Sequence, residues 1–212
     1  MPQYTPMMQQ YLETKKEYKD CILFYRLGDF YEMFFDDAVT ASRELELTLT
    51  GKDCGQEERA PMCGVPYHAV ESYLNRLISK GYKVAICEQV EDPKTAKGIV
   101  KREVIRVVTP GTNLNMQALD ESKNNYLMSI VYLGDELGVS VVDFSTGDYF
   151  VTEVSSGNIL IDEINKFVPS EIIINEYFAM SGIDLDPVRE KLGISVSALP
   201  NWYFDESLCV RK

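Results

Sequence analysis

Residues 26–38 of this chain run RLGDFYEMFFDDA and follow a short apolar segment, 21–25, of the kind that forms a buried strand. Side chains two positions apart share one face of an extended segment, so Phe30 and Glu32 are predicted to point the same way and Tyr31 the other way. A flat ring beside a carboxylate suits a nucleobase, because the ring can stack on the base and the carboxylate can bond to its edge. Most aromatic rings at strand ends pack into a core instead, and the residues alone leave both interpretations open.

The composition is that of a globular protein with one large or two modest domains. The chain has 212 residues, of which 45% are hydrophobic and 25% are charged. No segment approaches the roughly 20 apolar residues of a membrane span, and residues 1–20 lack the apolar core of a signal peptide. The five cysteines are scattered and form no CxxC pair, so neither disulfides nor zinc sites are expected. These features predict a cytoplasmic protein with reduced thiols and no membrane association.

The net charge of −12 argues against a nucleic-acid partner, because DNA-binding proteins commonly carry a basic face. The charge is unevenly distributed along the chain. The second half is rich in acidic residues, whereas basic residues gather between positions 92 and 109, at Lys94, Lys97, Lys101, Arg102 and Arg106. A basic contact strip on an acidic body is compatible with this pattern, and such a body would avoid indiscriminate DNA binding.

Periodicity and turn residues predict an α/β organisation for the first half. Thr5 before Pro6 predicts a helix start, because a threonine cap and a proline at the first helical position favour initiation. Further helices are predicted after Asp36 or Asp37 and over 69–80, where apolar residues recur at helical spacing up to Gly81. Strands are predicted at 21–25, 45–49, 82–89 and 103–108, and loops at 51–58 and 92–98.

The polar residues 113–125 are predicted to link a first domain, 1–112, to a second domain, 126–212. In the second domain, strands are predicted at 126–133, 138–143 and 149–154, followed by a helix over about 159–168 and a strand at 172–174. Three strands, a helix and a fourth strand predict another α/β layer. The fold class expected for the whole chain is therefore α/β (α+β).

Four separated segments resemble the MutS family of DNA mismatch-repair proteins, in the family's order. They are 26–38, with the Phe-X-Glu motif at Phe30 and Glu32, then APMCGVPYHA at 60–69, VAICEQ at 84–89 and VVTPGT at 107–112. The resemblance implies a mixed-sheet mismatch-recognition domain followed by part of a ribonuclease-H-like connector domain. It also implies that Phe30 enters the minor groove and stacks on a mispaired or unpaired base, while Glu32 hydrogen-bonds to the edge of that base.

The same resemblance suggests secondary DNA contacts. Lys52 matches a basic family position next to the mismatch-binding surface, and Leu27 lies where the family often has an apolar side chain near the distorted base step. For Tyr67 and His68, a structural role is favoured over direct contact. Each basic side chain is by default an ordinary exposed charge, although lysines of the loop from 92 to 101 are expected to order on phosphates. The full set is Leu27, Lys52, Arg59, Tyr67, His68, Lys97, Lys101 and Arg102.

No catalytic or metal site is predicted in this chain. The segment GKDCG at 51–55 lacks the GxxxxGK[ST] spacing of a phosphate-binding loop, and a single histidine, His68, excludes sites built on several histidines. The alternative function is that of a metal-dependent ribonuclease-H-like nuclease, although most carboxylates of this kind are simply solvated. Its candidate ligands are Asp143, Asp148, Asp162 and Glu163.

The resemblance further implies partners that act beyond these residues. Family members are ABC-type ATPases whose ATP and Mg²⁺ bind in a C-terminal domain, so this chain resembles an N-terminal fragment that is not itself an enzyme. The expected ligand is double-stranded DNA with mismatches or small loops. A homodimer formed through the C-terminal domains, MutL as a partner, and a cytoplasmic, nucleoid-associated location are also implied.

Overall fold

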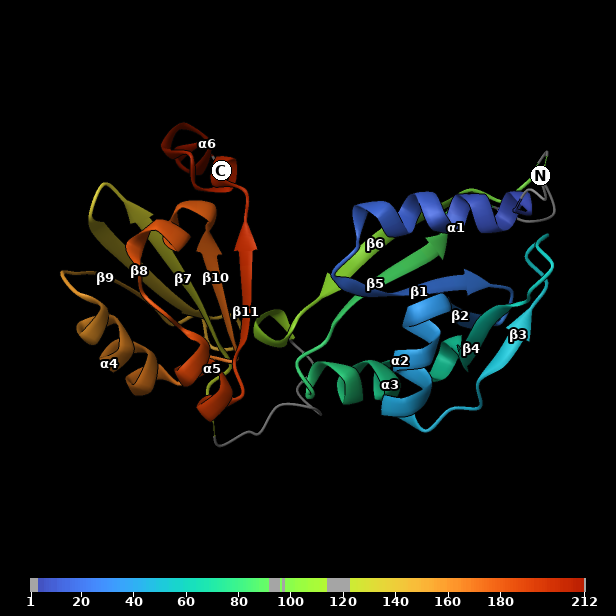
Figure 1. Ribbon diagram of the computed structural model, residues 1–212, viewed down its shortest axis with the longest axis horizontal. Helices are drawn as coiled ribbons and strands as arrows, with labels where there is room; N and C mark the ends of the chain where they lie inside the picture. The colour runs from blue at the N-terminus through green and yellow to red at the C-terminus, as the bar shows by residue number, and fades with distance from the viewer. Residues whose placement is uncertain (1–3, 92–95, 97, 114–122, 212) are drawn as a thin grey trace. The chain divides into compact units, whose positions relative to one another are not determined.

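The computed structural model describes residues 4–91, 96, 98–113 and 123–211. They form two compact units, Met1–Thr109 and Pro110–Lys212, each with its own sheet and its own core (Figure 1). Within the described ranges, no helix is long and apolar enough to cross a membrane. Both sheets mix parallel and antiparallel strands, which confirms the α/β (α+β) class.

The first unit is built on a six-stranded sheet with the order β3-β4-β2-β1-β5-β6. Only β1 and β5 run parallel among its neighbouring pairs. Because β1 is hydrogen-bonded on both sides, the hairpin that joins it to β2 starts from the middle of the sheet. The strands are β1 Cys21–Leu27, β2 Phe30–Phe34, β3 Thr50–Lys52, β4 Ala60–Pro66, β5 Lys83–Gln89 and β6 Arg102–Val108.

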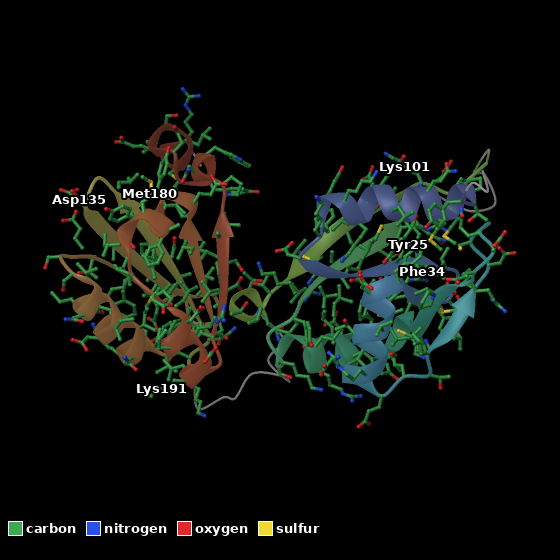
Figure 2. All side chains as sticks on the ribbon, viewed as in Figure 1. Tyr25, Phe34, Lys101, Asp135, Met180 and Lys191 are labelled. Atoms are coloured by element: carbon green, nitrogen blue, oxygen red, sulfur yellow. The ribbon has the colours of Figure 1, made fainter. Side chains whose placement is uncertain are left out.

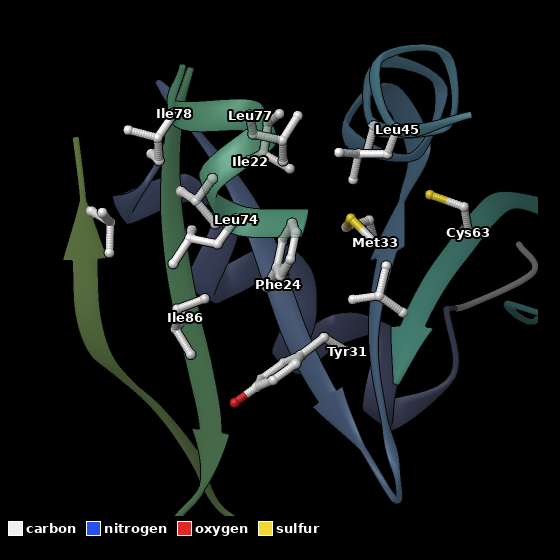
Figure 3. Packing of buried hydrophobic residues seen from close by; sticks show 14 of the residues in the cluster. Ile22, Phe24, Tyr31, Met33, Leu45, Cys63, Leu74, Leu77, Ile78 and Ile86 are labelled. Carbon is white, nitrogen blue, oxygen red and sulfur yellow. The ribbon is translucent and has the colours of Figure 1, made fainter. Parts of the chain in front are cut away.

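Helices cover both faces of this sheet. One face carries α1 (Pro6–Glu17), and the other carries α2 (Phe35–Leu45) and α3 (Val70–Ile78), which the short 3-10 helix η1 (Tyr67–Ala69) precedes. Along β1, Ile22 and Phe24 pack beneath α2 and α3 (Figure 3), whereas Leu23 and Tyr25 pack beneath α1. Both faces of β1 are buried, as its continuous apolar run indicates.

A buried carboxylate ties these layers together. Asp37, in the first turn of α2, accepts hydrogen bonds from the Leu23 amide at 3.0 Å and the Tyr11 hydroxyl at 3.3 Å. It also pairs with the Lys15 ammonium at 2.9 Å. Burial and the nearby Asp37 charge raise the pKa of the Tyr11 hydroxyl, which therefore stays protonated and donates. The residue expected to cap α2 thus joins α1, β1 and α2, and no side chain caps that helix.

The strand predicted at 45–49 is wrong. Residues up to Leu45 belong to α2, which ends as Glu46 takes a left-handed conformation, and the strand β3 lies instead at Thr50–Lys52. The alternation of leucines at 45, 47 and 49 misled the prediction, because Leu45 is the last buried position of the helix and Leu49 is exposed. Part of the predicted loop at 51–58 therefore forms a strand.

The second unit has a five-stranded sheet with the order β11-β10-β7-β8-β9. Strands β7, β8 and β9 form an antiparallel meander, and β10 and β11 add in parallel beside β7, which is the ribonuclease-H-like arrangement. The strands are β7 Tyr126–Leu133, β8 Glu136–Asp143, β9 Tyr149–Val154, β10 Glu171–Asn175 and β11 Ser195–Leu199. The helices are α4 Gly157–Phe167, η3 Glu176–Ser181, α5 Asp186–Leu192, η4 Asn201–Phe204 and α6 Glu206–Val210.

The short helix η2 (Pro110–Thr112) packs with the second unit. The Gly111 amide donates to Glu171 Oε2 at 3.1 Å, and a Cβ on Gly111 would lie only 3.0 Å from side-chain atoms of Leu127 and Glu171. This close approach explains the glycine at position 111. Residues 114–122 of the predicted 113–125 linker lie outside the described residues, so the linker stays a prediction.

Candidate nucleic-acid interface

The β1–β2 hairpin carries the aromatic ring singled out in the sequence. Leu27 pairs with Phe30 across a turn of two residues, and Gly28 at the first of them has a φ of +58°, which glycine adopts without strain. The Phe30 side chain is left 47% exposed directly after this turn, whereas Phe34, on the same strand and face, is fully buried. Phe30 therefore directly follows a two-residue hairpin turn and is not part of a core.

The alternation along β2 is the one expected for a strand. Tyr31 and Met33 point into the core beneath α2 and α3 (Figure 3), and Phe34 packs beneath α1, where it lies with Tyr25 (Figure 2). Phe30 and Glu32 share the α1 face of the sheet but lie beyond the core that α1 covers. Leu27, a secondary candidate, is half-buried against this core.

Glu32 is engaged by a lysine from a strand distant in sequence. Its Oε2 lies 2.5 Å from the ammonium of Lys52 on β3, and the two side chains are 16% and 32% exposed. Glu32 pairs in register with Gly64 on β4, where a Cβ would lie 3.5 Å from Glu32 Cγ and 3.3 Å from the Tyr31 carbonyl. The tight approach at Gly64 is therefore to the Tyr31 backbone, and the Glu32 side chain lies at ordinary contact distance.

The opposite face of the hairpin is braced by a cluster that the sequence did not reveal. The Arg26 guanidinium stacks on the Tyr67 ring, 3.8 Å from its centroid, and pairs with Glu88 of β5 at 3.1 Å. The Tyr31 hydroxyl donates to the same Glu88 carboxylate, and burial, then Glu88, raises the pKa of Tyr31 to about 12. The Tyr67 backbone N–H also bonds to Asp29 O at 3.0 Å, and its side chain is 43% exposed, so its role in DNA contact stays a prediction. Arg26 and Glu88 are 62 positions apart, so no short-range pattern could show the pair.

The remaining basic candidates are placed in different ways. Arg102 is hydrogen-bonded within the first unit: its Nε donates to Arg26 O at 2.7 Å and its NH1 donates to Gln10 Oε1 at 3.1 Å. Lys101 lies at the surface (Figure 2), where its ammonium pairs with Glu103 at 2.5 Å. Arg59 is exposed beside β3, and His68 is exposed with its ring edge-on to Tyr67. Lys97 and residues 92–95 lie outside the described residues.

The four carboxylates of the nuclease alternative form no metal-binding group among the described residues. Asp148 accepts a hydrogen bond from the Thr146 hydroxyl at 2.9 Å. Asp143 is fully buried and accepts hydrogen bonds from Asn124 and the Asn125 amide, and from the amide and hydroxyl of Ser145. Glu163 pairs with Lys166 at 2.9 Å, and Asp162 is exposed. Across the residues that the structure describes, no three His, Cys, Asp or Glu side chains are grouped to hold a metal ion.

Comparison with known proteins agrees with the geometry. The model of MutS domain I matches residues 5–117, and that of MutS domain II matches residues 125–209. The chain is similar to DNA mismatch repair protein MutS of Lachnoclostridium phytofermentans, with 64% identity over 100% of the chain and 23% of that protein. It is also similar to the MutS proteins of Acetivibrio thermocellus, with 57% identity over 100% of the chain and 25% of that protein, and of Ruminiclostridium cellulolyticum, with 58% identity over 95% of the chain and 23% of that protein. The chain thus spans about a quarter of the length of these relatives, and it belongs to the MutS family of DNA mismatch-repair proteins, whose domains I and II it carries.

Proposed function

We propose that this chain recognises mispaired or unpaired bases in duplex DNA, with Phe30 as a wedge and Glu32 as a hydrogen-bonding partner of the base. The observation that carries the proposal is the contrast between Phe30, 47% exposed after a two-residue turn, and Phe34, fully buried four residues later. Exposure of an aromatic ring to water is unfavourable in free energy. Stacking on a base would remove the ring from water and compensate for that cost.

The mechanism of mismatch recognition would follow from the greater deformability of DNA at a mismatch. A ring inserted from the minor groove must unstack one base step and kink the duplex, and a mismatch lowers the cost of both. Discrimination therefore comes from the DNA and not from a code of base contacts. Glu32, on the same face as Phe30, would then meet the edge of the displaced base, and phosphate contacts by basic side chains would hold the protein in register.

The activity of the whole protein is part of the proposal. At full length, as in the family, two subunits would clamp DNA, and one of them would insert its Phe30. ATP and Mg²⁺ would bind in an ABC-type ATPase domain outside this chain, and their binding would lead to recruitment of MutL in the nucleoid. The residues described here would then bind DNA without catalysing a reaction. Lys52, the lysine of the GKDCG segment, supports this division because it is already paired with Glu32.

The test is a binding titration of the full-length protein on matched duplexes and on duplexes with one mismatch. Stacking on an aromatic ring is worth about 1–3 kcal/mol per base, which corresponds to about 5- to 150-fold in affinity. Phe30→Ala should lower the ratio of mismatched to matched affinity by a factor in this range. Phe144→Ala is the matched control, because Phe144 is 50% exposed but lies in the second unit. A Phe30→Ala protein that keeps its full preference would contradict the proposal.

A further inference from the structure

The Glu32–Lys52 pair has a geometry that a phosphate-binding lysine does not need. Lys52 comes from β3 at the edge of the sheet, and its ammonium lies 2.5 Å from Glu32 Oε2 and 5.7 Å from the centroid of the buried Phe34 ring. The Lys52 side chain is 32% exposed, which is low for a lysine at a sheet edge. It is therefore held in one place by a carboxylate and an aromatic ring.

The pair also determines which part of Glu32 stays available. Lys52 bonds to Oε2, and among the described residues no donor bonds to Oε1. A carboxylate has lone pairs for several hydrogen bonds, so Oε1 can accept another one while Oε2 is occupied. Gly64 on the neighbouring strand lies beside Glu32 in register, so the Glu32 side chain is packed along β4 as well as against Lys52.

We propose that Lys52 is a positioning residue that acts through Glu32. Its ammonium offsets part of the charge of the carboxylate and directs Oε1 to the base, so that Lys52 does not serve as an independent phosphate contact. This inference rests on the proposed function. Without Lys52, an uncompensated carboxylate would approach the minor groove, where phosphate repulsion and loss of hydration both oppose it.

The two roles for Lys52 make opposite predictions about additivity. A lysine that binds phosphate contributes the same amount whether or not residue 32 is charged. A lysine that neutralises Glu32 contributes much when Glu32 is present and little when glutamine replaces it. A double-mutant cycle separates the two, because it measures the part of the effect that depends on the partner.

The experiment uses the full-length protein and measures Kd on matched and mismatched duplexes at several salt concentrations. The proteins are the wild type, Lys52→Met, Glu32→Gln and the double variant. Methionine keeps an unbranched apolar stem over Phe34 and removes the charge. Lys52→Met should weaken binding to both duplexes about tenfold or more when Glu32 is present, and about twofold or less in the Glu32→Gln background. Lys52→Arg, which keeps a cation, should restore most of the affinity.

Two outcomes would overturn the proposal. One is an equal loss from Lys52→Met in both backgrounds. The other is a fall of about 0.9 in the slope of log K against log salt when Lys52→Met is added to Glu32→Gln, because that is the signature of one lost phosphate contact.

The control is the Glu163–Lys166 pair on α4, at 2.9 Å in the second unit. Lys166→Met should leave both affinities unchanged in either background. Phe30→Ala, titrated alongside, keeps the two proposals apart. If Phe30→Ala retains the mismatch preference, the wedge function fails, whereas the Lys52 cycle alone decides the role of Lys52. Circular dichroism of each variant shows that it is folded.

Discussion

Two identical side chains four residues apart on β2 show how position determines role. Phe34 is fully buried and packs edge-on against Tyr11 at 4.9 Å between ring centroids, whereas Phe30 is half-exposed. Emptying a buried phenylalanine site costs about 3–5 kcal/mol of unfolding free energy. Phe34→Ala should therefore lose about that much, and Phe30→Ala should change stability by less than about 0.5 kcal/mol. Urea unfolding of the 212-residue chain, followed by circular dichroism, checks both. If Phe30→Ala lost as much unfolding free energy as Phe34→Ala, Phe30 would have to be part of the core.

The charge of Glu32 should oppose unproductive binding. A carboxylate beside phosphates is repelled, and in Glu32→Gln the part of that charge that Lys52 leaves unbalanced is gone while a donor is gained. Glu32→Gln should therefore bind both duplexes at least as well as wild type, with the larger gain on matched DNA, so that discrimination falls as affinity rises. Titration of the full-length protein at one salt concentration, with Glu32→Ala alongside, measures this. Equal weakening on both duplexes would show that the carboxylate is an ordinary acceptor.

At the scale of elements, the sequence predicted the helices and strands that show a clear local periodicity of apolar residues. The helix over 69–80 is confirmed as α3, because Leu74, Leu77 and Ile78 repeat at helical spacing and Gly81 follows. The strand β3 was missed because three residues in a polar segment carry almost no periodic signal, and its formation depends on pairing with β4. The sequence showed that Lys52 matches a basic position of the family. Its contact with Glu32 could not be predicted, because the contact requires β2, β4 and β3 to pair in register.

The braced hairpin gives a prediction about Arg26. Arg26→Ala removes the stacking on Tyr67, the pair with Glu88 and the hydrogen bond from Arg26 Nε to Gly28 O at 2.5 Å. It leaves the Glu88 carboxylate, 24% exposed, without its cation. We expect a loss of about 1–3 kcal/mol in the free energy of unfolding. Arg26→Lys should recover little, because lysine lacks the planar group that stacks.

The control for Arg26 is Arg106→Ala. Arg106 also pairs with a carboxylate, Glu71, at 3.2 Å, but both side chains are about half exposed. Exposed pairs contribute about 0–1 kcal/mol, so this variant should lose little stability. Equal losses from Arg26→Ala and Arg106→Ala in urea unfolding would argue against the brace.

The turn between β8 and β9 should make the stability of the second unit depend on pH. Burial opposes the charge of Asp143, but hydrogen bonds from Ser145, Asn124 and Asn125 outweigh it and hold the pKa of Asp143 below its ordinary value. A carboxyl whose pKa is lower in the folded state stabilises the fold above its unfolded value of about 3.9, and this stabilisation is lost as the pH falls through the folded value. The second unit should therefore weaken as the pH falls below about 4.

The single tryptophan, Trp202, lies in the second unit and reports its unfolding by fluorescence. Asp143→Asn should lower stability at pH 7 and flatten the dependence between about pH 4 and pH 2. Asp162→Asn, which changes an exposed carboxylate, is the control and should do neither. An unchanged acid profile in Asp143→Asn would contradict this role for Asp143.

At the scale of the whole molecule, Phe30 lies on a strongly acidic chain. The net charge is −12, and of the basic candidates that the structure describes, Lys52, Lys101 and Arg102 are each paired or hydrogen-bonded within the protein. Phosphate neutralisation supplies much of the affinity of DNA-binding proteins, and these three side chains are already engaged within the protein. Specific recognition should therefore depend on contacts made elsewhere along the full-length protein.

The 212-residue chain by itself should accordingly bind DNA weakly. Non-specific protein–DNA affinities are about 10⁻⁴–10⁻⁶ M at physiological salt, and this chain should fall in that range, with less than about threefold preference for a mismatch. The reason is effective concentration: contacts elsewhere in the proposed full-length clamp would hold Phe30 against the groove, because each linked contact raises the local concentration of the next one. A fluorescence titration of matched and mismatched duplexes, run in parallel with the full-length protein, measures the difference. Nanomolar, mismatch-specific binding by the monomeric chain would mean that domains I and II are sufficient for recognition, and that the clamp has another purpose.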